Sequence, residues 1–343
     1  ADSLAVVDVS DPARPTLLGV FTDATSLDGA AGVVYDSATR RAIVASADAD
    51  SVAVVCVPNE LLGVGACGSN LALLGAQSNS DSLRGARGVA YDAARQLALV
   101  ASASANSLAV VSLADPTGPQ VVGVLVNGTA LRGARGVAYD AASGLAFVSA
   151  AEGGALSVVS VSDPTRPTLV GALVDAERLR GASAVAFDAS TGRAYVACSG
   201  ASSIAVVDVS TPEAPELVGE LAGVASLGGA VGVALDAAEQ RVVVACELAD
   251  GVAVVDVRDP RSPRLLGNVS GAGVLGGASA VALGASSQLA FVLGATAGSL
   301  VVLDVSDASL PSVVGTLISS SLAGASSAAY DPLTQRVFVS SAG

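Results

Sequence analysis

The sequence predicts an all-β fold, a seven-bladed β-propeller with four antiparallel strands in each blade. Seven apolar segments that read almost alike recur along the chain, and their starts are separated by 48, 56, 48, 48, 48 and 48 residues. A second series, in which an apolar run ends in a turn Asp, alternates with the first, and no stretch shows a helical period. Four-stranded units at this spacing are typical of propellers. The seven segments begin at Ser3, Ser51, Ser107, Ala155, Ser203, Gly251 and Ser299.

One period shows how each unit divides into four strands. In the third unit we expect strands at 136–140, 145–150, 156–162 and 167–174, because each is rich in Val, Leu, Ala or aromatic residues. The links between them read DAASG, AEGG and DPTRP. Asp can bond nearby backbone, Gly permits positive φ and Pro fixes φ, so each link suits a tight turn.

The phase of the repeat predicts how the ring closes. The chain begins with the third and fourth strands of a unit and ends with the first and second. We therefore expect one domain, 1–343, in which 1–22 and 326–343 share a closing blade, two strands from each end. Six further blades lie between 23 and 325. This closure pairs strands that would otherwise be exposed edges.

The repeat itself resembles a known family. The VVDVSDP core that starts at Val6, with a Pro three residues after it and a Y-D turn in neighbouring units, is similar to the LVIVD-repeat, seven-bladed propellers, which look like YVTN-type surface propellers. The resemblance covers essentially the whole chain. It implies the propeller fold and a place among extracellular or surface proteins, and it leaves the task open because fold does not imply function.

Composition excludes several kinds of chemistry. The chain has no His, Met or Trp, and all 17 basic residues are Arg. Imidazole bases, His-ligated metals, Schiff-base lysines and a P-loop lysine are therefore excluded. The formal charge of -14 argues against nucleic acid and anionic membrane surfaces as partners. No apolar run approaches the length that crosses a bilayer, so we expect no membrane insertion of this segment.

The few aromatic side chains fall into two repeat-equivalent columns, in which Leu, Ile or Val takes their place in other units. We interpret both columns as packing between blades, which disfavours a glycan-stacking platform. The first column is Tyr35, Tyr91, Tyr139, Phe187 and Tyr330; the second is Phe147, Tyr195, Phe291 and Phe338; Phe21 stands outside both.

Three further patterns favour structural roles over chemistry. The two matches to G-x-G-x-x-G, at 63–68 and 271–276, lack the helix that a dinucleotide site needs. The recurring turn Asp residues are expected to bond nearby backbone. We predict no cofactor; the candidate calcium ligands are the acid pairs 48 and 50, and 247 and 250, and neither pair has the pattern of a dedicated site.

The four cysteines divide into two pairs. Cys67 lies in the only eight-residue insertion, and Cys56 occupies a column otherwise held by Asp or Ser. This co-occurrence favours a Cys56–Cys67 disulfide and an oxidising compartment; the alternative is two unrelated thiols. Cys198 and Cys246 are repeat-equivalent and are expected to be reduced core residues.

Two N-glycosylation sequons add weak support for an extracellular location. They begin at Asn127 and Asn268. Because Ser and Thr are common in this chain, about one sequon is expected by chance.

Basic residues gather in three successive loops between units. The loops read LRGAR, LRGAR and ERLRGAS, and they carry Arg178 together with the predicted interaction face, Arg84, Arg87, Arg132, Arg135 and Arg180. An acidic arc formed by Asp2, Asp23, Asp28, Asp48 and Asp50 should lie beside it. The alternative interpretation is a solvated rim, paired locally with Asp81, Glu152, Asp175 and Glu177.

These observations favour a non-enzymatic structural or protein-interaction module of a secreted or cell-surface protein. The expected partner is a second copy, another domain of a larger surface protein, or an acidic glycan. The alternative is a ligand-binding or lactonase-like hydrolytic propeller that uses acids and Arg at the mouth of the axial channel.

Overall fold

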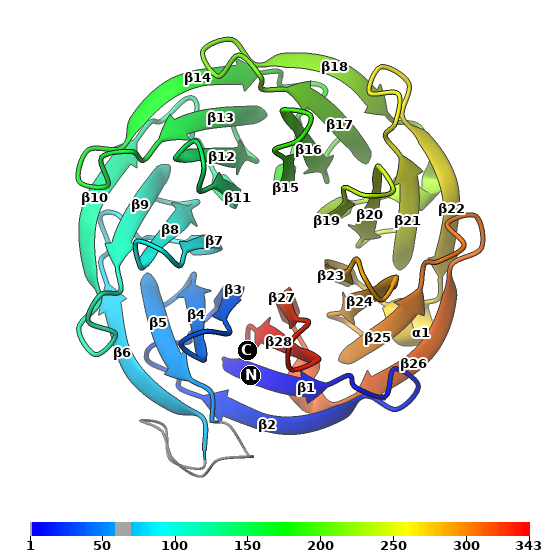
Figure 1. The fold of residues 1–343 in the computed structure, drawn as a ribbon, viewed down its shortest axis with the longest axis horizontal. Helices are drawn as coiled ribbons and strands as arrows, with labels where there is room; N and C mark the ends of the chain where they lie inside the picture. The colour runs from blue at the N-terminus through cyan, green and yellow to red at the C-terminus, as the bar shows by residue number, and fades with distance from the viewer. Residues whose placement is uncertain (1, 59–69) are drawn as a thin grey trace.

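Residues 2–58 and 70–343, which this computed structural model describes, form seven four-stranded antiparallel sheets in a ring. Figure 1 shows the ring from one end, with the sheets arranged as blades around a central axis. The predicted all-β, seven-bladed propeller is therefore confirmed. In blades 1 to 6 the strands follow in chain order from the axis outwards, and we call them the first to fourth strands.

The first three blades run through the N-terminal half of the chain. Blade 1 contains β3 (Ala30–Asp36), β4 (Arg41–Ser46), β5 (Ser51–Cys56) and β6 (Ala72–Ser78). Blade 2 contains β7 (Ala86–Asp92), β8 (Leu97–Ser102), β9 (Ser107–Ser112) and β10 (Gln120–Val126). Blade 3 contains β11 (Ala134–Asp140), β12 (Leu145–Ala150), β13 (Ala155–Ser160) and β14 (Thr168–Val174).

The next three blades repeat the pattern. Blade 4 contains β15 (Ala182–Asp188), β16 (Arg193–Cys198), β17 (Ser203–Asp208) and β18 (Glu216–Leu221). Blade 5 contains β19 (Ala230–Asp236), β20 (Arg241–Cys246), β21 (Gly251–Asp256) and β22 (Arg264–Ser270). Blade 6 contains β23 (Ala278–Gly284), β24 (Leu289–Gly294), β25 (Ser299–Asp304) and β26 (Ser312–Ile318).

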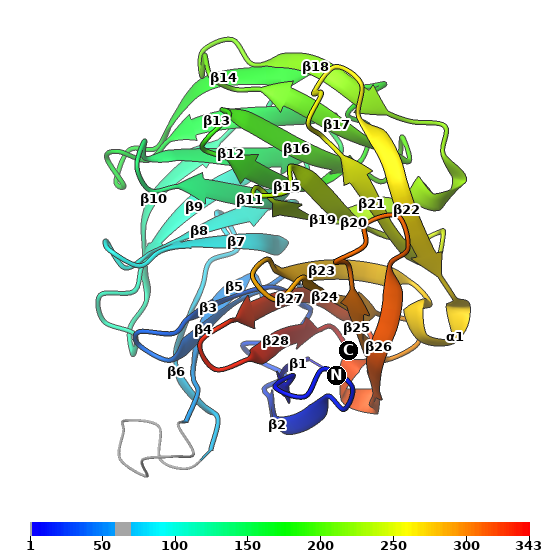
Figure 2. The ribbon, with the colours of Figure 1, turned by 45° about the vertical axis from the view of Figure 1, so that its right-hand side comes forward.

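The closing blade combines both ends of the chain. Its strands are β27 (Ala325–Asp331), β28 (Arg336–Ser341), β1 (Ser3–Asp8) and β2 (Thr16–Thr22). Six residue pairs join β1 to β28, from Ser3 opposite Ser341 to Asp8 opposite Arg336. Figure 2 shows the two termini beside each other in this blade. The predicted two-plus-two closure is confirmed.

Helical structure is confined, among the described residues, to three single turns in loops that enter a first strand. These are η1 (Ala225–Leu227), α1 (Ala272–Leu275) and η2 (Ser320–Leu322). A turn of three or four residues is too short to give a periodic sequence signal, which is why the sequence showed none. No helix in the described part of the chain is long and apolar enough to cross a membrane.

The hydrophobic core lies between neighbouring blades. Phe147 of β12 stacks on Phe187 of β15, with ring centroids 4.1 Å apart. Phe338 of β28 stacks on Tyr35 of β3 in the same way, at 3.9 Å, across the point where the ring closes. The side chains of Phe147 and Phe338 are both buried. The interpretation of the aromatic columns as packing between blades is therefore confirmed.

A column of glycines in the fourth strands allows neighbouring blades to approach closely. A Cβ on Gly123 would lie 2.1 Å from the carbonyl oxygen of Pro164 in the next blade, and one on Gly315 would lie 2.2 Å from that of Pro12. Carbon and oxygen cannot approach this closely without a shift of backbone. The recurring Gly and the D-P-x-x-P loop are therefore two halves of one contact between blades.

The turn Asp residues bond nearby backbone, as predicted, and also connect blades. Asp92 accepts from the backbone N–H of Arg95 at 3.0 Å, and the Arg95 guanidinium donates to the same carboxylate at 2.7 Å. That guanidinium also donates to the Val161 carbonyl of blade 3 at 2.9 Å. Burial raises the pKa of Asp92, but the hydrogen bonds from Arg95 and Tyr139 outweigh it, so the pKa lies below its usual value.

A second guanidinium makes the same connection from a different position. Arg241, which is buried, bonds Asp236 at 3.1 Å and also the carbonyl of Val305 in the next blade. Asp236 and Val305 are the repeat equivalents of the residues that Arg95 contacts, whereas Arg241 begins a strand and Arg95 lies in a turn. Two positions that are not repeat-equivalent therefore place an Arg guanidinium group in the same space between neighbouring blades.

The cysteine predictions have different outcomes. Cys198 and Cys246 are buried free thiols, as expected. Burial raises the pKa of each to about 12. The proposed Cys56–Cys67 disulfide involves Cys67, which lies outside the described residues, and it stays a prediction.

Candidate functional site

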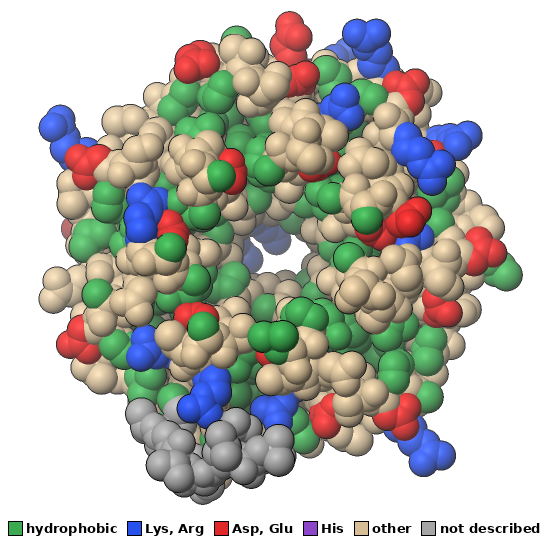
Figure 3. Space-filling model, in the orientation of Figure 1, with side chains coloured by type: hydrophobic (Ala, Val, Ile, Leu, Met, Phe, Trp, Pro, Cys, Tyr) green, Lys and Arg blue, Asp and Glu red, His purple; other side chains and the backbone are tan. Residues whose placement is uncertain are grey.

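The axis of the ring ends in an opening lined by the first strands. We call this the entry end, because each first strand begins there. The second residue of each first strand lines the opening, and this ring consists of Ala31, Arg87, Arg135, Ser183, Val231, Ser279 and Ser326. Figure 3 shows the central opening of the molecule, with basic side chains visible inside it.

Close packing of the first strands brings the two arginines together. A Cβ on Gly32 would lie 2.1 Å from the carbonyl oxygen of Arg87, and one on Gly88 would lie 2.4 Å from that of Arg135. Glycine at the third position of these strands thus lets neighbouring backbones nearly touch. The guanidinium groups of blades 2 and 3 therefore enter the channel from adjacent strands.

The opening holds a cavity of about 380 Å³ whose wall includes Arg87, Arg135 and Glu247. Glu247 reaches it from blade 5, in the turn that follows β20. We call these three side chains and the cavity between them the axial cluster. It combines two cations and one anion at the mouth of an otherwise apolar and hydroxyl-lined channel.

Electrostatics couple the three side chains of the axial cluster. Burial lowers the pKa of Arg135, the nearby charge of Arg87 lowers it further, and Glu247 acts in the opposite direction. Within the described residues, none of the three side chains forms a hydrogen bond or an ion pair with another protein group. The cluster therefore holds charged groups that the fold leaves without direct partners.

The hydroxyl groups beside the cluster are already engaged. Ser183 donates to the carbonyl of Gly181 at 2.7 Å, and Ser279 donates to that of Ala325 at 2.6 Å. Ser326 likewise donates to the carbonyl of Ala30 at 2.8 Å. The free hydrogen-bonding capacity at this end of the channel therefore belongs mainly to the two arginines.

The structure divides the five arginines of the predicted interaction face into two groups. Arg87 and Arg135 lie on first strands and line the channel, whereas Arg84, Arg132 and Arg180 lie exposed on the loops that enter the first strands. Arg84 donates to the carbonyl of Ser104 at 3.0 Å, and Arg180 donates to that of Gly200. Sequence reasoning missed the division, because Arg84 and Arg87 are only three residues apart although the strand begins between them.

Among the described residues, Arg132 is the one exposed arginine of this group that has an anionic partner. Its guanidinium lies 3.7 Å from the Glu152 carboxylate, and both side chains are more than half exposed. Such a pair contributes little stability, about 0–1 kcal/mol. The local pairing expected of a solvated rim is therefore present at one of the three exposed arginines.

Two of the four acids considered as calcium ligands, Asp50 and Asp250, have structural roles. Asp50 accepts from the backbone N–H of Gly85 at 2.9 Å, and Asp250 accepts from that of Gly277 at 2.8 Å. In the acidic arc, the Asp2 carboxylate accepts hydrogen bonds from the backbone N–H groups of Gly29 and Gly343. No group of three His, Cys, Asp or Glu side chains placed to hold a metal ion occurs among the described residues.

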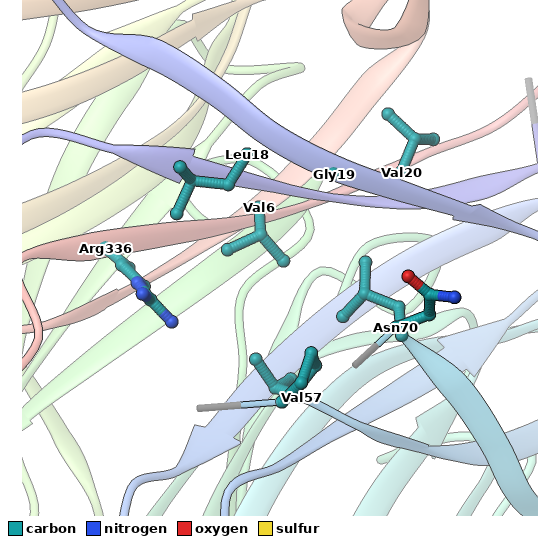
Figure 4. A pocket seen from close by; sticks show the side chains of 9 residues that line it. Val6, Leu18, Gly19, Val20, Val57, Asn70 and Arg336 are labelled. Carbon is teal, nitrogen blue, oxygen red and sulfur yellow. The ribbon is translucent and has the colours of Figure 1, made fainter. Parts of the chain in front are cut away.

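A second cavity, of about 220 Å³, lies between the closing blade and blade 1. Figure 4 shows Val6, Leu18 and Arg336 on one side of it and Val57 and Asn70 on the other. It adjoins both ends of the segment 59–69, which lies outside the described residues, so we assign no function to it.

The two sequons lie in different surroundings. Asn268 is exposed on β22. Asn127 is partly buried, and its side-chain oxygen accepts from the backbone N–H of Thr129 at 3.0 Å and from that of Ala130 at 2.9 Å. Glycosylation at either position stays a prediction.

Comparison with protein families identifies the repeat. A model of the LVIVD repeat matches residues 1–23, 144–175, 188–222 and 290–318. The chain contains LVIVD repeats. Each matched segment of this LVIVD propeller includes the third and fourth strands of a blade, where the VVDVS-like core lies. A search of curated proteins gave no match to the chain.

Solved structures resemble the LVIVD propeller at low sequence identity. A functionally unknown protein from Desulfotomaculum acetoxidans is 13% identical, with a TM-score of 0.72 and 99% of each chain covered. A Bacteroides fragilis protein provisionally named a 6-phosphogluconolactonase is 11% identical, with a TM-score of 0.68, over 92% of this chain and 98% of that one. A protein from Lactobacillus plantarum is 15% identical at a TM-score of 0.72, over 92% and 98%. These similarities show the fold.

Proposed function

We propose that this LVIVD propeller is a non-enzymatic interaction module of a secreted or cell-surface protein, and that it binds its partner through Arg84, Arg132 and Arg180. The observation that supports this proposal is the placement of the three side chains. They extend from equivalent loops of three successive blades, and all three are exposed at the entry end.

The fold does not require these arginines. Their repeat equivalents in the other four blades are Asp28, Gly228, Gly276 and Ala323. Arg is well suited to interfaces, because its planar fork binds carboxylates at two points and is weakly hydrated. The partner is accordingly an acidic surface, either the acidic arc of a second copy or an acidic glycan.

A triple variant, Arg84→Ser, Arg132→Ser and Arg180→Ser, tests this function. Sedimentation velocity measures self-association at low salt, and retention on immobilised heparin measures glycan binding. We expect the parent to show at least one of these activities, and both the triple variant and raised salt to weaken it. A control with Arg14→Ser and Arg166→Ser, which changes loops between third and fourth strands, should behave as the parent does. Equal behaviour of parent and triple variant in both assays would reject the proposal.

A hydrolytic propeller is the second candidate, and the axial cluster is the observation that favours it. Glu247 would take a proton from an attacking water, while Arg87 and Arg135 would stabilise the oxyanion that forms. The Bacteroides neighbour supplies a substrate to test, 6-phosphogluconolactone. This candidate would be supported if the parent hydrolysed the lactone faster than the spontaneous rate, if Glu247→Gln abolished that hydrolysis, and if Glu152→Gln preserved it. A rate equal to the spontaneous one would exclude it for this substrate.

A further inference from the structure

The axial cluster carries an inference that goes beyond the interaction face. We infer that the cavity at the entry end binds a small oxyanion, a carboxylate or a phosphate group, between the guanidinium groups of Arg87 and Arg135. This site is separate from the exposed Arg84, Arg132 and Arg180, so each can be tested while the other is intact.

The first argument is the cost of placing two like charges side by side. Arg87 and Arg135 arise from adjacent first strands whose backbones nearly touch; Arg135 is partly buried and Arg87 is exposed to the channel opening. Two cations on adjacent strands repel each other, and the partial burial of Arg135 strengthens that repulsion because less water screens it. An oxyanion between them would replace this repulsion with attraction.

The second argument is that the ring architecture does not need arginine here. The equivalent residues of the other five blades are Ala31, Ser183, Val231, Ser279 and Ser326. All are smaller and uncharged, and their first strands also pack against the first strands of the neighbouring blades. The two arginines are therefore additions to a scaffold that is complete without them.

The third argument concerns hydrogen bonding. The Ser hydroxyls of the wall donate to backbone carbonyls, whereas the guanidinium groups of Arg87 and Arg135 have no protein acceptor within the described residues. A guanidinium presents N–H donors in a rigid fork that matches the spacing of carboxylate and phosphate oxygens. Two such forks would meet one oxyanion from two sides.

Glu247 sets the charge that the site prefers. With two cations and one anion the axial cluster has a net charge of one positive unit, which a monovalent carboxylate would neutralise. A divalent phosphate would gain more from the arginines and would also be repelled more by Glu247. The cavity of about 380 Å³ has room for either group attached to a small molecule.

Isothermal titration calorimetry with two probes, inorganic phosphate and the monovalent carboxylate acetate, tests the inference. We expect saturable binding of at least one probe to the parent. Arg87→Ser and Arg135→Ser should each weaken it at least tenfold, and Glu247→Gln should strengthen it several-fold. Serine is the residue that equivalent positions carry, and an unchanged melting temperature will show that the variants are folded.

Matched controls separate this site from the interaction face. The single variants Arg84→Ser and Arg132→Ser each remove one positive charge from the neighbouring loops, as each channel variant does, and each should bind the probe within twofold of the parent. The inference is overturned if the parent binds neither probe, or if either control weakens binding as much as the channel variants do. Preference for acetate or for phosphate tells which group the ligand carries.

Discussion

The contact that closes the ring can be tested by comparing two equivalent phenylalanines. Phe338 is 0% exposed and stacks on Tyr35 across the boundary between the closing blade and blade 1. Phe147 is 1% exposed and stacks on Phe187 between blades 3 and 4, which the chain connects covalently. If the closing blade is packed as tightly as the others, Phe338→Ala and Phe147→Ala should lower the free energy of unfolding by the same amount.

The expected cost follows from burial. Truncation of a fully buried Phe removes its apolar surface from the core and leaves a cavity, which costs about 3–5 kcal/mol of unfolding free energy. The unfolding entropy is about 2 cal/mol/K per residue, so over 343 residues the melting temperature should fall by roughly 4 to 7 °C. Leu333 lies in the closing blade and is 81% exposed, so Leu333→Ala should change the melting temperature little.

Scanning calorimetry and chemical denaturation measure the three variants side by side. Equal losses at Phe338 and Phe147, with little change at Leu333, would establish that the non-covalent boundary is as well packed as a covalent one. The reasoning would be refuted if Phe338→Ala lowered the free energy of unfolding by less than about 1 kcal/mol while Phe147→Ala lowered it by the expected ~3–5 kcal/mol. It would mean that the closing blade is open for much of the time in solution.

Three other predictions concern packing, pH and thiol reactivity. Gly123→Ala should lower the melting temperature by several degrees because its Cβ meets a carbonyl oxygen of the next blade, whereas Gly273→Ala, whose Cβ meets nothing within 4 Å, should be neutral or stabilising. The pKa of Asp92 is lower in the folded protein than its ordinary 3.8, so its stabilising effect is complete above that pH and is lost as pH falls through the folded value. Calorimetry from pH 7 to pH 3 should therefore show a steeper loss of stability for the parent than for Asp92→Asn. Cys198 and Cys246, whose pKa is raised to about 12, should resist iodoacetamide at pH 8 in the native protein and react once it is unfolded; rapid native labelling would contradict the burial described.

Much of the fold was predictable because the repeat determines it. Strand positions, blade number and closure all follow from a pattern that recurs at a constant spacing, and a single ambiguous unit is corrected by its six neighbours. The aromatic columns were predictable for the same reason, since residues that interchange with Leu and Val pack in a core.

The candidate site was predicted less well because it departs from the repeat. Arg87 and Arg135 were recognised as unusual, but their placement in the channel depends on where the loop ends and the strand begins. Their partner in the axial cluster, Glu247, comes from a turn three blades after blade 2, and no local pattern connects it with them. Arg95 and Arg241 could not be related to each other from the repeat for the same reason, because they occupy positions that are not repeat-equivalent and yet place their guanidinium groups at equivalent points between blades.

The pairing of β1 with β28 also has a mechanical consequence. The first pair, Ser3 opposite Ser341, lies at the ends of the chain, so a force that separates the termini acts on that pair before the others. The six pairs would then open one after another, as a zipper does, rather than resist together in shear. A propeller pulled through its ends would therefore yield first at the closing blade and at low force, and the remaining blades would be exposed to tension only afterwards.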